Sequence, residues 1–243
     1  MQEKTFEVKI MSKHDGHRDR MRNRFLEQGL DGFEDHQVLE MLLYYSIPRK
    51  DTNEMAHDLI AAFGSFSGVL DAPVGELCKV PGVGMSIATM LSFAGSVVRY
   101  YMVDKAKQDV TIFATLNDCV DYLRPYFTGR RNETVYMLCL DAKCKLLASK
   151  MLGEGSVNSA AVPLRKIVDI ALATNATSVV LAHNHPGGIA FPSGDDLNTT
   201  KQLANILRSV DIILADHIVF SDEGSVSMAQ SGYYDAKMQL TLI

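Results

Sequence analysis

Residues 178–186 read Ser-Val-Val-Leu-Ala-His-Asn-His-Pro, an apolar, β-branched run that ends in two histidines. The part from Ser178 to Ala182 predicts a buried central strand, because it is short, continuously apolar and rich in β-branched residues. Side chains two positions apart project from the same face of a strand. We therefore expect His183 and His185 to lie side by side where this strand ends.

Asp196 follows the two histidines, in the segment Pro192-Ser193-Gly194-Asp195-Asp196. The turn at residues 186–188 should break the strand, and the loop after it is long enough to fold back and present Asp196 from the first turn of the next helix. Two imidazoles and one carboxylate leave the fourth position of tetrahedral zinc to water, as in catalytic sites. Zinc acidifies such a water to a pKa of about 7, so we expect a catalytic site with one Zn²⁺ per chain.

Each half of this pattern also has a plainer interpretation. Ser193-x-x-Asp196 is a capping box for the helix that follows, and a His-x-His pair is often only a hydrogen-bonded turn. The two halves occur together, after an apolar strand and before a helix, and this combination favours a metal site. Capping and metal ligation are compatible roles for the same turn.

The spacing His183-x-His185, seven residues, Ser193, two residues and Asp196 resembles the JAMM (MPN-plus) metalloprotease motif. More narrowly, the chain resembles the RadC family. The segments that carry this second resemblance are the run from Val162 through His183 to Pro192-Ser193, Asp216-His217-Ile218-Val219, Gly16-His17-Arg18-x-Arg20, Ile47-Pro48-Arg49-Lys50-Asp51-Thr52 and Phe63-Gly64-Ser65. The resemblance implies an α+β (α/β) chain, with an N-terminal all-helical domain and a C-terminal JAMM-type (cytidine deaminase-like) mixed sheet flanked by helices.

The resemblance also implies roles for individual residues. His183, His185 and Asp196 would be metal ligands, and Ser193 would donate a hydrogen bond to the developing oxyanion. A JAMM site also needs a glutamate that relays a proton, and the pattern favours Glu133, between a helical segment and the strand-like run 134–140. Glu154, in Gly153-Glu154-Gly155-Ser156, is the alternative general base. For either glutamate the plainer interpretation is a solvated loop carboxylate.

Two segments depart from the family pattern. Pro163-Leu164-Arg165-Lys166 stands where Pro-Arg-Glu is usual, and Gly187 stands where a serine is common. Both changes affect the expected substrate contacts and leave the ligands intact. His217 follows Asp216 on an apolar strand-like run, and we interpret it as a buried histidine that is satisfied in the core or orients a metal ligand.

The composition of the chain narrows the class of protein. Its 243 residues are enough for two domains, and its net charge of −5 argues against a protein whose whole surface binds nucleic acid. No signal-peptide or bilayer-length apolar stretch is evident, which predicts a cytoplasmic protein without membrane association. The cysteines lack C-x-x-C spacing and are expected to be reduced core residues: Cys78, Cys119, Cys139 and Cys144.

Apolar spacing predicts a helical domain over residues 1–104, with helices at 38–45, 55–63 and 87–101, and a polar linker at 103–109. A JAMM-type domain would then occupy residues 110–243, with strands at 134–140, 146–152, 178–182 and 212–220. One of its helices carries an apolar stripe that should face the sheet, formed by Leu164, Ile167, Val168, Ala171 and Leu172.

A second motif, Val80-Pro81-Gly82-Val83-Gly84 followed by Ala88, resembles the hairpin of a helix-hairpin-helix element. Gly82 and Gly84 would let backbone N–H groups reach a phosphate and so contact DNA without sequence preference. DNA-binding hairpins usually add a basic residue after the second glycine, which this chain lacks. Lys13 and the arginines at positions 18, 20, 22 and 24 are interspersed with the acidic residues Asp15, Asp19 and Glu27. We interpret them as a solvated helix face, so a structural or protein-docking hairpin is favoured.

Two functional hypotheses follow. The first is a zinc-dependent metallohydrolase that cleaves peptide or isopeptide bonds of an unidentified protein or peptide substrate with a metal-activated water. The second, which the customary name of the family implies, is a DNA-associated repair or recombination factor that uses the hairpin for non-specific DNA binding. The intact ligand set favours the first, because a scaffold has no use for an open coordination position.

Overall fold

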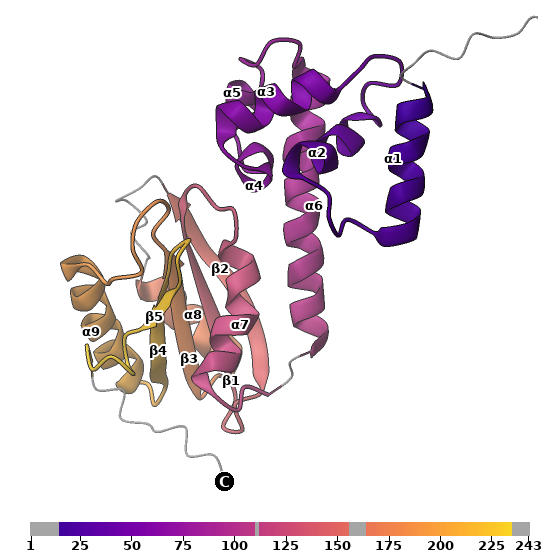
Figure 1. The fold of residues 1–243 in the computed structure, drawn as a ribbon. Coiled ribbons are helices and arrows are strands. Elements are labelled where there is room, and N and C mark those ends of the chain that lie inside the picture. The colour runs from indigo at the N-terminus through magenta and orange to yellow at the C-terminus, as the bar shows by residue number, and fades with distance from the viewer. Residues whose placement is uncertain (1–14, 110–111, 156–163, 235–243) are drawn as a thin grey trace, which may run out of the picture. The chain divides into compact units, whose positions relative to one another are not determined.

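The computed structural model describes residues 15–109, 112–155 and 164–234, so Val162 and Pro163 lie outside the described residues. The chain divides into two compact units, Met1–Val97 and Val98–Ile243. The first is helical, and the second contains a mixed five-stranded sheet with helices (Figure 1). The α+β class expected from the sequence is therefore confirmed.

The N-terminal unit packs its helices around an apolar core of its own. The three helices predicted for this part of the chain are confirmed as α2, α3 and α6, and buried leucines from each of them, such as Leu39, Leu59 and Leu91, meet in that core. Its described elements are α1 (Asp15–Gln28), α2 (Asp35–Leu43), α3 (Asn53–Phe63), α4 (Phe66–Leu70), α5 (Val74–Leu77) and the first part of α6 (Met85–Asp109).

Arg18 on α1 is buried, which corrects the interpretation of the arginines at 18, 20, 22 and 24 as one solvated helix face. Its guanidinium lies 4.5 Å from the centre of the Tyr44 ring. It donates to the carbonyl oxygens of Ile47 at 2.6 Å and Pro48 at 2.7 Å, and also to that of Lys50. A planar group with five donors can satisfy several carbonyls at once, so Arg18 fastens the connection between α2 and α3 to α1.

The segment 103–109, predicted as a linker, is the last part of α6. The boundary between the two units falls at residues 97 and 98, within the same helix. Beyond that boundary Val103 and Ala106 pack against a hydrophobic cluster of the C-terminal unit. Arg99 donates to the carbonyl oxygens of Thr128 at 2.8 Å and Gly129 at 3.3 Å, which fixes this end of α6 to that unit.

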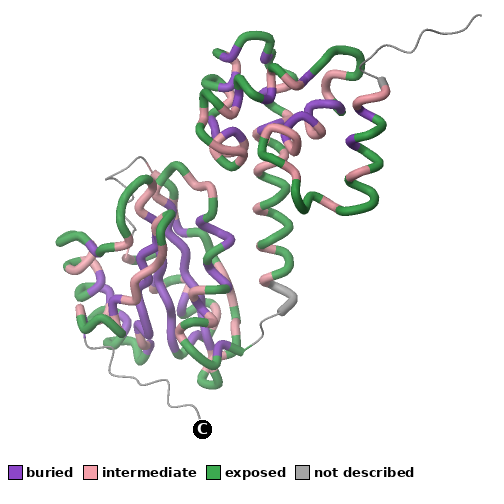
Figure 2. The backbone as a smooth tube through the Cα atoms, viewed as in Figure 1, coloured by how far each residue is buried: buried purple, intermediate pink, exposed green. Residues whose placement is uncertain are grey.

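The C-terminal unit is built on a sheet with the strand order β2-β1-β3-β4-β5. Strands β3 and β4 are parallel, and the other neighbours are antiparallel. All four predicted strands are confirmed, and β3, the run that opened the sequence analysis, lies in the middle of the sheet and is buried along its whole length (Figure 2). The strands are β1 (Glu133–Leu140), β2 (Leu146–Gly155), β3 (Ser178–Asn184), β4 (Ile213–Phe220) and β5 (Ser225–Ser227).

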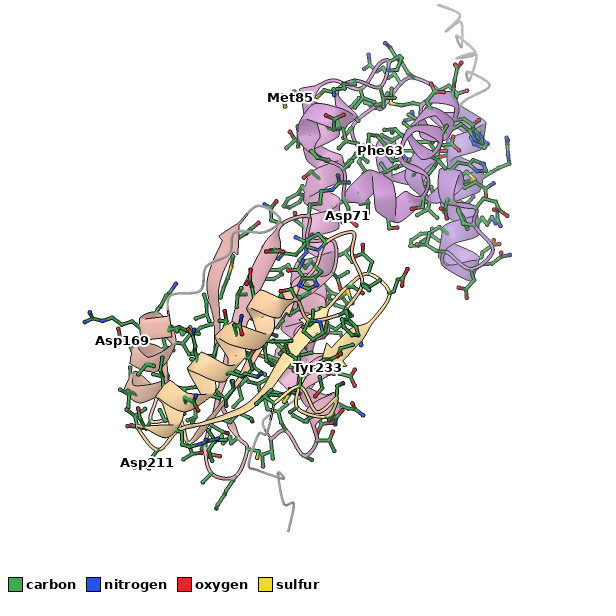
Figure 3. All side chains as sticks on the ribbon, turned by 90° about the vertical axis from the view of Figure 1, so that its left-hand side faces the viewer. Phe63, Asp71, Met85, Asp169, Asp211 and Tyr233 are labelled. Atoms are coloured by element: carbon green, nitrogen blue, oxygen red, sulfur yellow. The ribbon has the colours of Figure 1, made fainter. Side chains whose placement is uncertain are left out.

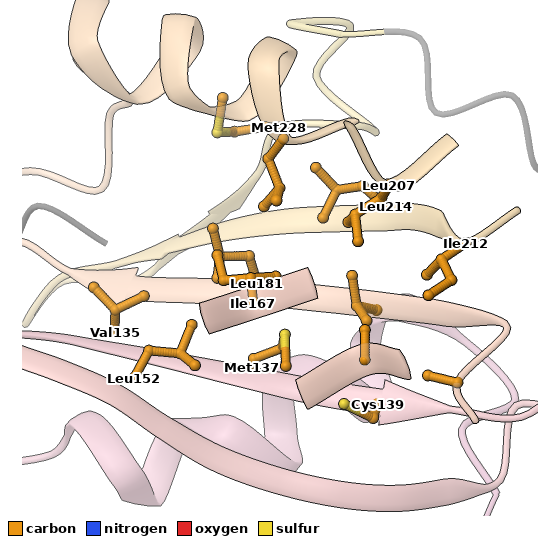
Figure 4. Close-up of a cluster of buried hydrophobic side chains, with 14 of the residues drawn as sticks. Val135, Met137, Cys139, Leu152, Ile167, Leu181, Leu207, Ile212, Leu214 and Met228 are labelled. Atoms are coloured by element: carbon orange, nitrogen blue, oxygen red, sulfur yellow. The ribbon is translucent and has the colours of Figure 1, made fainter. Parts of the chain in front are cut away.

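Helices cover both faces of this sheet. On one face α8 (Leu164–Ala173) and α9 (Gly194–Arg208) contribute Ile167 and Leu207 to a cluster with Met137 and Leu181 of the strands (Figure 4). On the other face α7 (Leu116–Phe127) packs its aromatic side chains against β1 and β4. Because both faces are covered, the central strands read as continuous apolar runs.

Leu172 is 49% exposed, so its predicted place in the apolar stripe of α8 is wrong. At 3.6 residues per turn Leu172 lies about 80° around the helix from Leu164, at the margin of the stripe. Ile167 and Ala171, about 60° and 20° from Leu164 on the other side, are fully buried. The stripe as a whole faces the sheet, and only its last member does not.

The four cysteines are free, and Cys119 and Cys139 are fully buried in the C-terminal unit. Burial raises the pKa of the Cys119 thiol to about 12, so this thiol stays protonated at neutral pH. The expectation of reduced core cysteines is confirmed for this pair, whereas Cys78 and Cys144 are partly exposed. Among the described helices, none combines the length and the apolar character needed to cross a bilayer.

Candidate metal centre

Two neighbouring elements bring the three predicted ligands together. His183 lies near the end of β3, paired across the sheet with Val135 of β1 and Val219 of β4. His185 comes one residue after the strand, and its N–H donates to the carbonyl oxygen of Phe220 at 2.8 Å. Asp196 lies in the first turn of α9, and α9 packs on the face of the sheet that carries His183. The strand end and the helix start thus meet at one point.

The three side chains could hold a single metal ion. Their ligand atoms all lie within 4.8 Å of one another. The Nε2 atoms of His183 and His185 are 2.9 Å apart. Asp196 Oδ1 lies 3.3 Å from His183 Nε2, and its Oδ2 lies 3.5 Å from His185 Nε2. Two imidazole nitrogens and one carboxylate are the donor set of a catalytic zinc site with an open position, so the residues present fit a zinc ion.

The second ring nitrogen of each histidine is held by another group. His185 Nδ1 lies 3.3 Å from the carbonyl oxygen of Ile189, so it carries a proton and donates it there. His183 Nδ1 lies 2.8 Å from Nε2 of His217 on β4. Both Nε2 atoms are left to face the site. The interpretation of His217 as a buried histidine is confirmed, and His217 contacts the candidate ligand His183.

Ser193 fixes the carboxylate of Asp196 through a capping box at the start of α9. Asp196 Oδ2 accepts from the Ser193 N–H at 2.7 Å and from its hydroxyl at 2.6 Å, and Ser193 Oγ accepts from the Asp196 N–H at 3.1 Å. Oδ1 takes no part in the box. Capping therefore occupies Oδ2, which also lies near His185, and leaves Oδ1 toward His183.

The charges at the site are strongly coupled. Burial by itself would raise the pKa of Asp196, but hydrogen bonds with His183, His185 and Ser193 outweigh it and hold that pKa far below its ordinary value. The hydrogen bond with Asp196 raises the pKa of His185. Burial lowers the pKa of His217 well below its ordinary value. Asp196 is therefore an anion at neutral pH, as a metal ligand must be.

Glu133 and Glu154 lie on opposite faces of the sheet. Glu133 begins β1 two residues before Val135, the partner of His183, so its side chain projects from the face that carries His183. Its charge contributes to the raised pKa of His185. Glu154 pairs with Thr134 in the register, on the other face. This placement favours Glu133 as the carboxylate of the site.

Glu154 is also occupied by other partners. Its Oε2 lies 3.2 Å from Nη1 of Arg130, and its Oε1 accepts from Asn132 at 3.0 Å. Arg130 in turn reaches the Tyr136 hydroxyl at 3.3 Å, which places this ion pair over the face that α7 covers. Both carboxylate oxygens of Glu154 thus have structural partners on the face opposite His183, so both position and partners count against Glu154 as the general base.

Apolar side chains border the site on the loop that joins β3 to α9. Ile189 and Phe191 are 66% and 58% exposed. The Phe191 ring stands edge-on to that of Tyr233, with their centres 5.8 Å apart. This loop therefore presents hydrophobic surface next to the histidines.

Gly82 and Gly84, the candidate DNA contacts, lie in the turn between α5 and α6. Gly82 has a φ of +80°, a conformation that favours glycine, and Met85 begins α6 (Figure 3). Lys79 lies just ahead of the turn but is paired with Glu76 at 2.7 Å. DNA contact by this hairpin stays a prediction.

Sequence reasoning missed Thr200 and the buried state of Asp216. Thr200 on α9 is fully buried, and its Oγ1 lies 2.5 Å from His217 Nδ1. The spacing between Asp196 and Thr200 could have indicated it, because a residue four positions after Asp196 lies on the same face of the helix. Asp216 accepts from the N–H groups of His217 at 2.7 Å and Ala229 at 3.0 Å.

Residues 113–233 match the family model of the RadC-like JAB domain. The match includes the three candidate ligands, Glu133 and the whole five-stranded sheet. It also agrees with the resemblance that the histidine and aspartate spacing carries. Through its C-terminal unit, the chain belongs to the family of RadC-like JAB domains.

Proposed function

We propose that this protein is a zinc-dependent hydrolase that cleaves peptide or isopeptide bonds of a protein or peptide substrate. The observation that carries the proposal is the convergence of His183 Nε2, His185 Nε2 and Asp196 Oδ1, each with its remaining polar atoms held by other groups. A set of three ligands with no fourth protein donor among the described residues is typical of a catalytic zinc site.

A bound zinc ion would polarise the substrate carbonyl and acidify a water molecule. The proposed general base is Glu133, which would take the proton of the attacking water and pass it to the leaving amine. Its position at the start of β1, on the face of His183, suits this role. Ile189 and Phe191 on the neighbouring loop would contact apolar parts of the substrate.

Ser193 is the proposed donor to the oxyanion that develops on the carbonyl oxygen. In this structure its hydroxyl proton points to Asp196 Oδ2. The oxyanion role therefore requires the hydroxyl to turn from the carboxylate to the substrate during the reaction. Until then Ser193 holds Asp196 in place for the metal.

Elemental analysis of the purified protein tests the metal first. We expect about one zinc per chain in the wild type, as one JAMM-type site would bind. The ion should be lost in His183→Ala and Asp196→Ala variants that keep their circular dichroism spectrum. A folded wild-type protein that takes up no metal after incubation with zinc would refute the hydrolase.

Turnover of fluorogenic peptides and of isopeptide-linked substrates tests the chemistry. Glu133→Gln should keep its zinc and lose about 10²- to 10⁴-fold in rate, because only proton transfer is removed. Glu154→Gln is the matched control on the opposite face and should stay active. If the control lost activity and Glu133→Gln did not, the two roles would have to be exchanged.

DNA binding through the Gly82–Gly84 hairpin is the alternative function. It would show as retention on DNA that weakens steeply with added salt, because phosphate contacts release counterions. Retention that persists in Asp196→Ala but is lost in a Gly82→Ala, Gly84→Ala double variant would assign DNA binding to the hairpin and separate it from the metal site.

A further inference from the structure

A chain of buried hydrogen bonds links two of the candidate metal ligands behind the site. His183 Nδ1 lies 2.8 Å from His217 Nε2, and His217 Nδ1 lies 2.5 Å from Thr200 Oγ1. Thr200 Oγ1 lies 2.6 Å from the main-chain carbonyl oxygen of Asp196. His183, His217 and Thr200 are at most 6% exposed, so water does not substitute for these contacts. The chain passes through β3, β4 and α9 and returns to the residue that supplies the carboxylate.

The direction of each hydrogen bond follows from the last one. A carbonyl oxygen cannot donate, so at 2.6 Å the single hydroxyl proton of Thr200 must lie toward Asp196. Thr200 Oγ1 can then only accept from His217, whose Nδ1 carries the proton. A neutral His217 has its lone pair on Nε2 and accepts from His183 Nδ1–H. His183 Nε2 is left without a proton, as metal binding requires.

We infer that His217 and Thr200 are positioning residues that fix the tautomer of His183. They do so through the chain of hydrogen bonds whose last acceptor is the main-chain carbonyl oxygen of Asp196. The inference rests on the proposed metal site. It means that residues which would not touch the ion set the orientation and protonation of one of its ligands. Ligand histidines usually donate to a carboxylate, a carbonyl or water. Here the acceptor is a second imidazole, that of His217. Its Nε2 can accept only while its proton is on Nδ1, where it is hydrogen-bonded to Thr200 Oγ1.

The surroundings of His217 show that the chain is built into the fold. The His217 N–H donates to Asp216 Oδ1 at 2.7 Å, and its carbonyl oxygen accepts from the Met228 N–H at 3.0 Å. Met228 also places its sulfur 3.7 Å from Thr200 Oγ1. Both the ring and the backbone of His217 are therefore held, and an unpaired ring N–H at this depth would be costly.

The test replaces Thr200 by residues of similar size. Thr200→Val keeps the shape of the side chain but removes Oγ1, the acceptor for His217 Nδ1–H. The ring proton of His217 should therefore move to Nε2, and Nε2 can then no longer accept from His183. Thr200→Ser keeps the hydroxyl and should behave as the wild type. Thr174→Val is the matched control, because Thr174 Oγ1, just after the end of α8, makes the same kind of bond, to the Ile170 carbonyl at 2.9 Å.

Nitrogen-15 NMR of metal-free protein reads the tautomers directly, because protonated and unprotonated ring nitrogens differ in shift. We expect Nδ1–H on His183 and His217 in the wild type and in the Ser and Thr174 variants, and a change at both rings in Thr200→Val. Zinc affinity, measured against a chromophoric chelator, should fall about 10- to 100-fold in Thr200→Val alone.

Unchanged tautomers in Thr200→Val, or zinc affinity equal to that of the Thr174→Val control, would overturn the inference. His217→Gln offers a second comparison, since its amide can accept from His183, and it should bind zinc more tightly than His217→Leu. If the wild type binds no zinc but Thr200→Val still shows the expected tautomer change, the proposed function is refuted and the positioning chain stands.

Discussion

At the scale of single residues, Ser193 and Asp196 serve two purposes with the same atoms. The carboxylate caps α9 through Oδ2 and offers Oδ1 to His183, and the hydroxyl of Ser193 both accepts and donates. A capping box fixes the carboxylate before any ion binds, so part of the ordering cost of the metal site is met by helix formation. The two interpretations of this turn from the sequence are therefore compatible.

Replacing Ser193 by alanine should affect both purposes. We expect Ser193→Ala to lower the free energy of unfolding by about 1 kcal/mol through the lost cap, and to weaken zinc binding about tenfold because Oδ2 of Asp196 is no longer held. Ser65→Ala is the control, since Ser65 caps α4 by accepting from the Gly68 N–H at 3.1 Å. Urea unfolding and chelator competition measure the two effects, and a control that also lost zinc affinity would contradict this argument.

Asp216 should make the stability of the protein depend on pH. Its side chain is fully buried, and its Oδ2 has no hydrogen-bond partner among the described residues. Burial raises its pKa above the ordinary value, so ionisation costs more in the folded chain than in the unfolded one. Stability from this group is therefore complete below the ordinary carboxyl pKa of about 4 and is lost as the pH rises through the raised value.

Asp216→Asn removes this titration and keeps an acceptor for the N–H groups of His217 and Ala229. The variant should gain stability relative to the wild type as the pH rises from about 4, the ordinary carboxyl pKa, to about 8. Urea unfolding of both proteins at the two pH values measures the difference. A difference that is the same at both values would show that the wild-type carboxyl does not titrate in this range.

Residue identity could be predicted where it follows from spacing along the chain. His183, His185 and Asp196 were found because a strand end and a helix start leave a short, readable pattern. Thr200 was missed because its role depends on the parallel pairing of β4 with β3, which brings His217 beside His183. Glu133 and Glu154 were separated only by the register of β1 with β2, because a shift of one residue exchanges the faces of a strand.

At the scale of elements, the connection between α2 and α3 is held by α1. A helix that looks polar in sequence contributes one buried arginine, Arg18, whose donors satisfy the carbonyl oxygens of Ile47, Pro48 and Lys50. The hydrophobic periodicity and the composition of α1 could not reveal that Arg18 is buried, because its partners are backbone atoms some thirty residues away. The end of α8 shows a similar limit, since Leu172 belongs to the apolar stripe in sequence but lies at its margin and is exposed.

Arg18→Met should therefore destabilise the N-terminal unit. It keeps much of the apolar stem but leaves several carbonyl oxygens without donors, and we expect a loss of about 2 to 3 kcal/mol. Arg22→Met on the same helix is the control, because the contact of Arg22 with Asp19 at 3.4 Å is exposed, and its loss should stay below about 0.5 kcal/mol. Equal losses in urea unfolding would show that Arg18 does not fasten this connection.

At the scale of the whole molecule, the two units have separate cores. The described apolar cluster of the N-terminal unit lies between residues 39 and 91, and those of the C-terminal unit lie between residues 103 and 234. All three candidate ligands belong to the second unit, on β3, just after it and on α9. A ligand stabilises the folding unit that forms its site and leaves other units unchanged.

Zinc should accordingly stabilise one unit only. At a concentration one hundred times its Kd the expected gain is about 2.7 kcal/mol, and it should appear as slower amide hydrogen exchange in β3, β4 and α9 with no change in α2 and α3. Mass spectrometry of exchanged peptides with and without zinc measures both regions in one sample. Asp196→Asn, which weakens the ligand set and keeps the side-chain shape, should abolish the effect. Equal slowing in α2 and α3 would mean that the two units unfold as one, and slowing that persists in Asp196→Asn would place the zinc elsewhere.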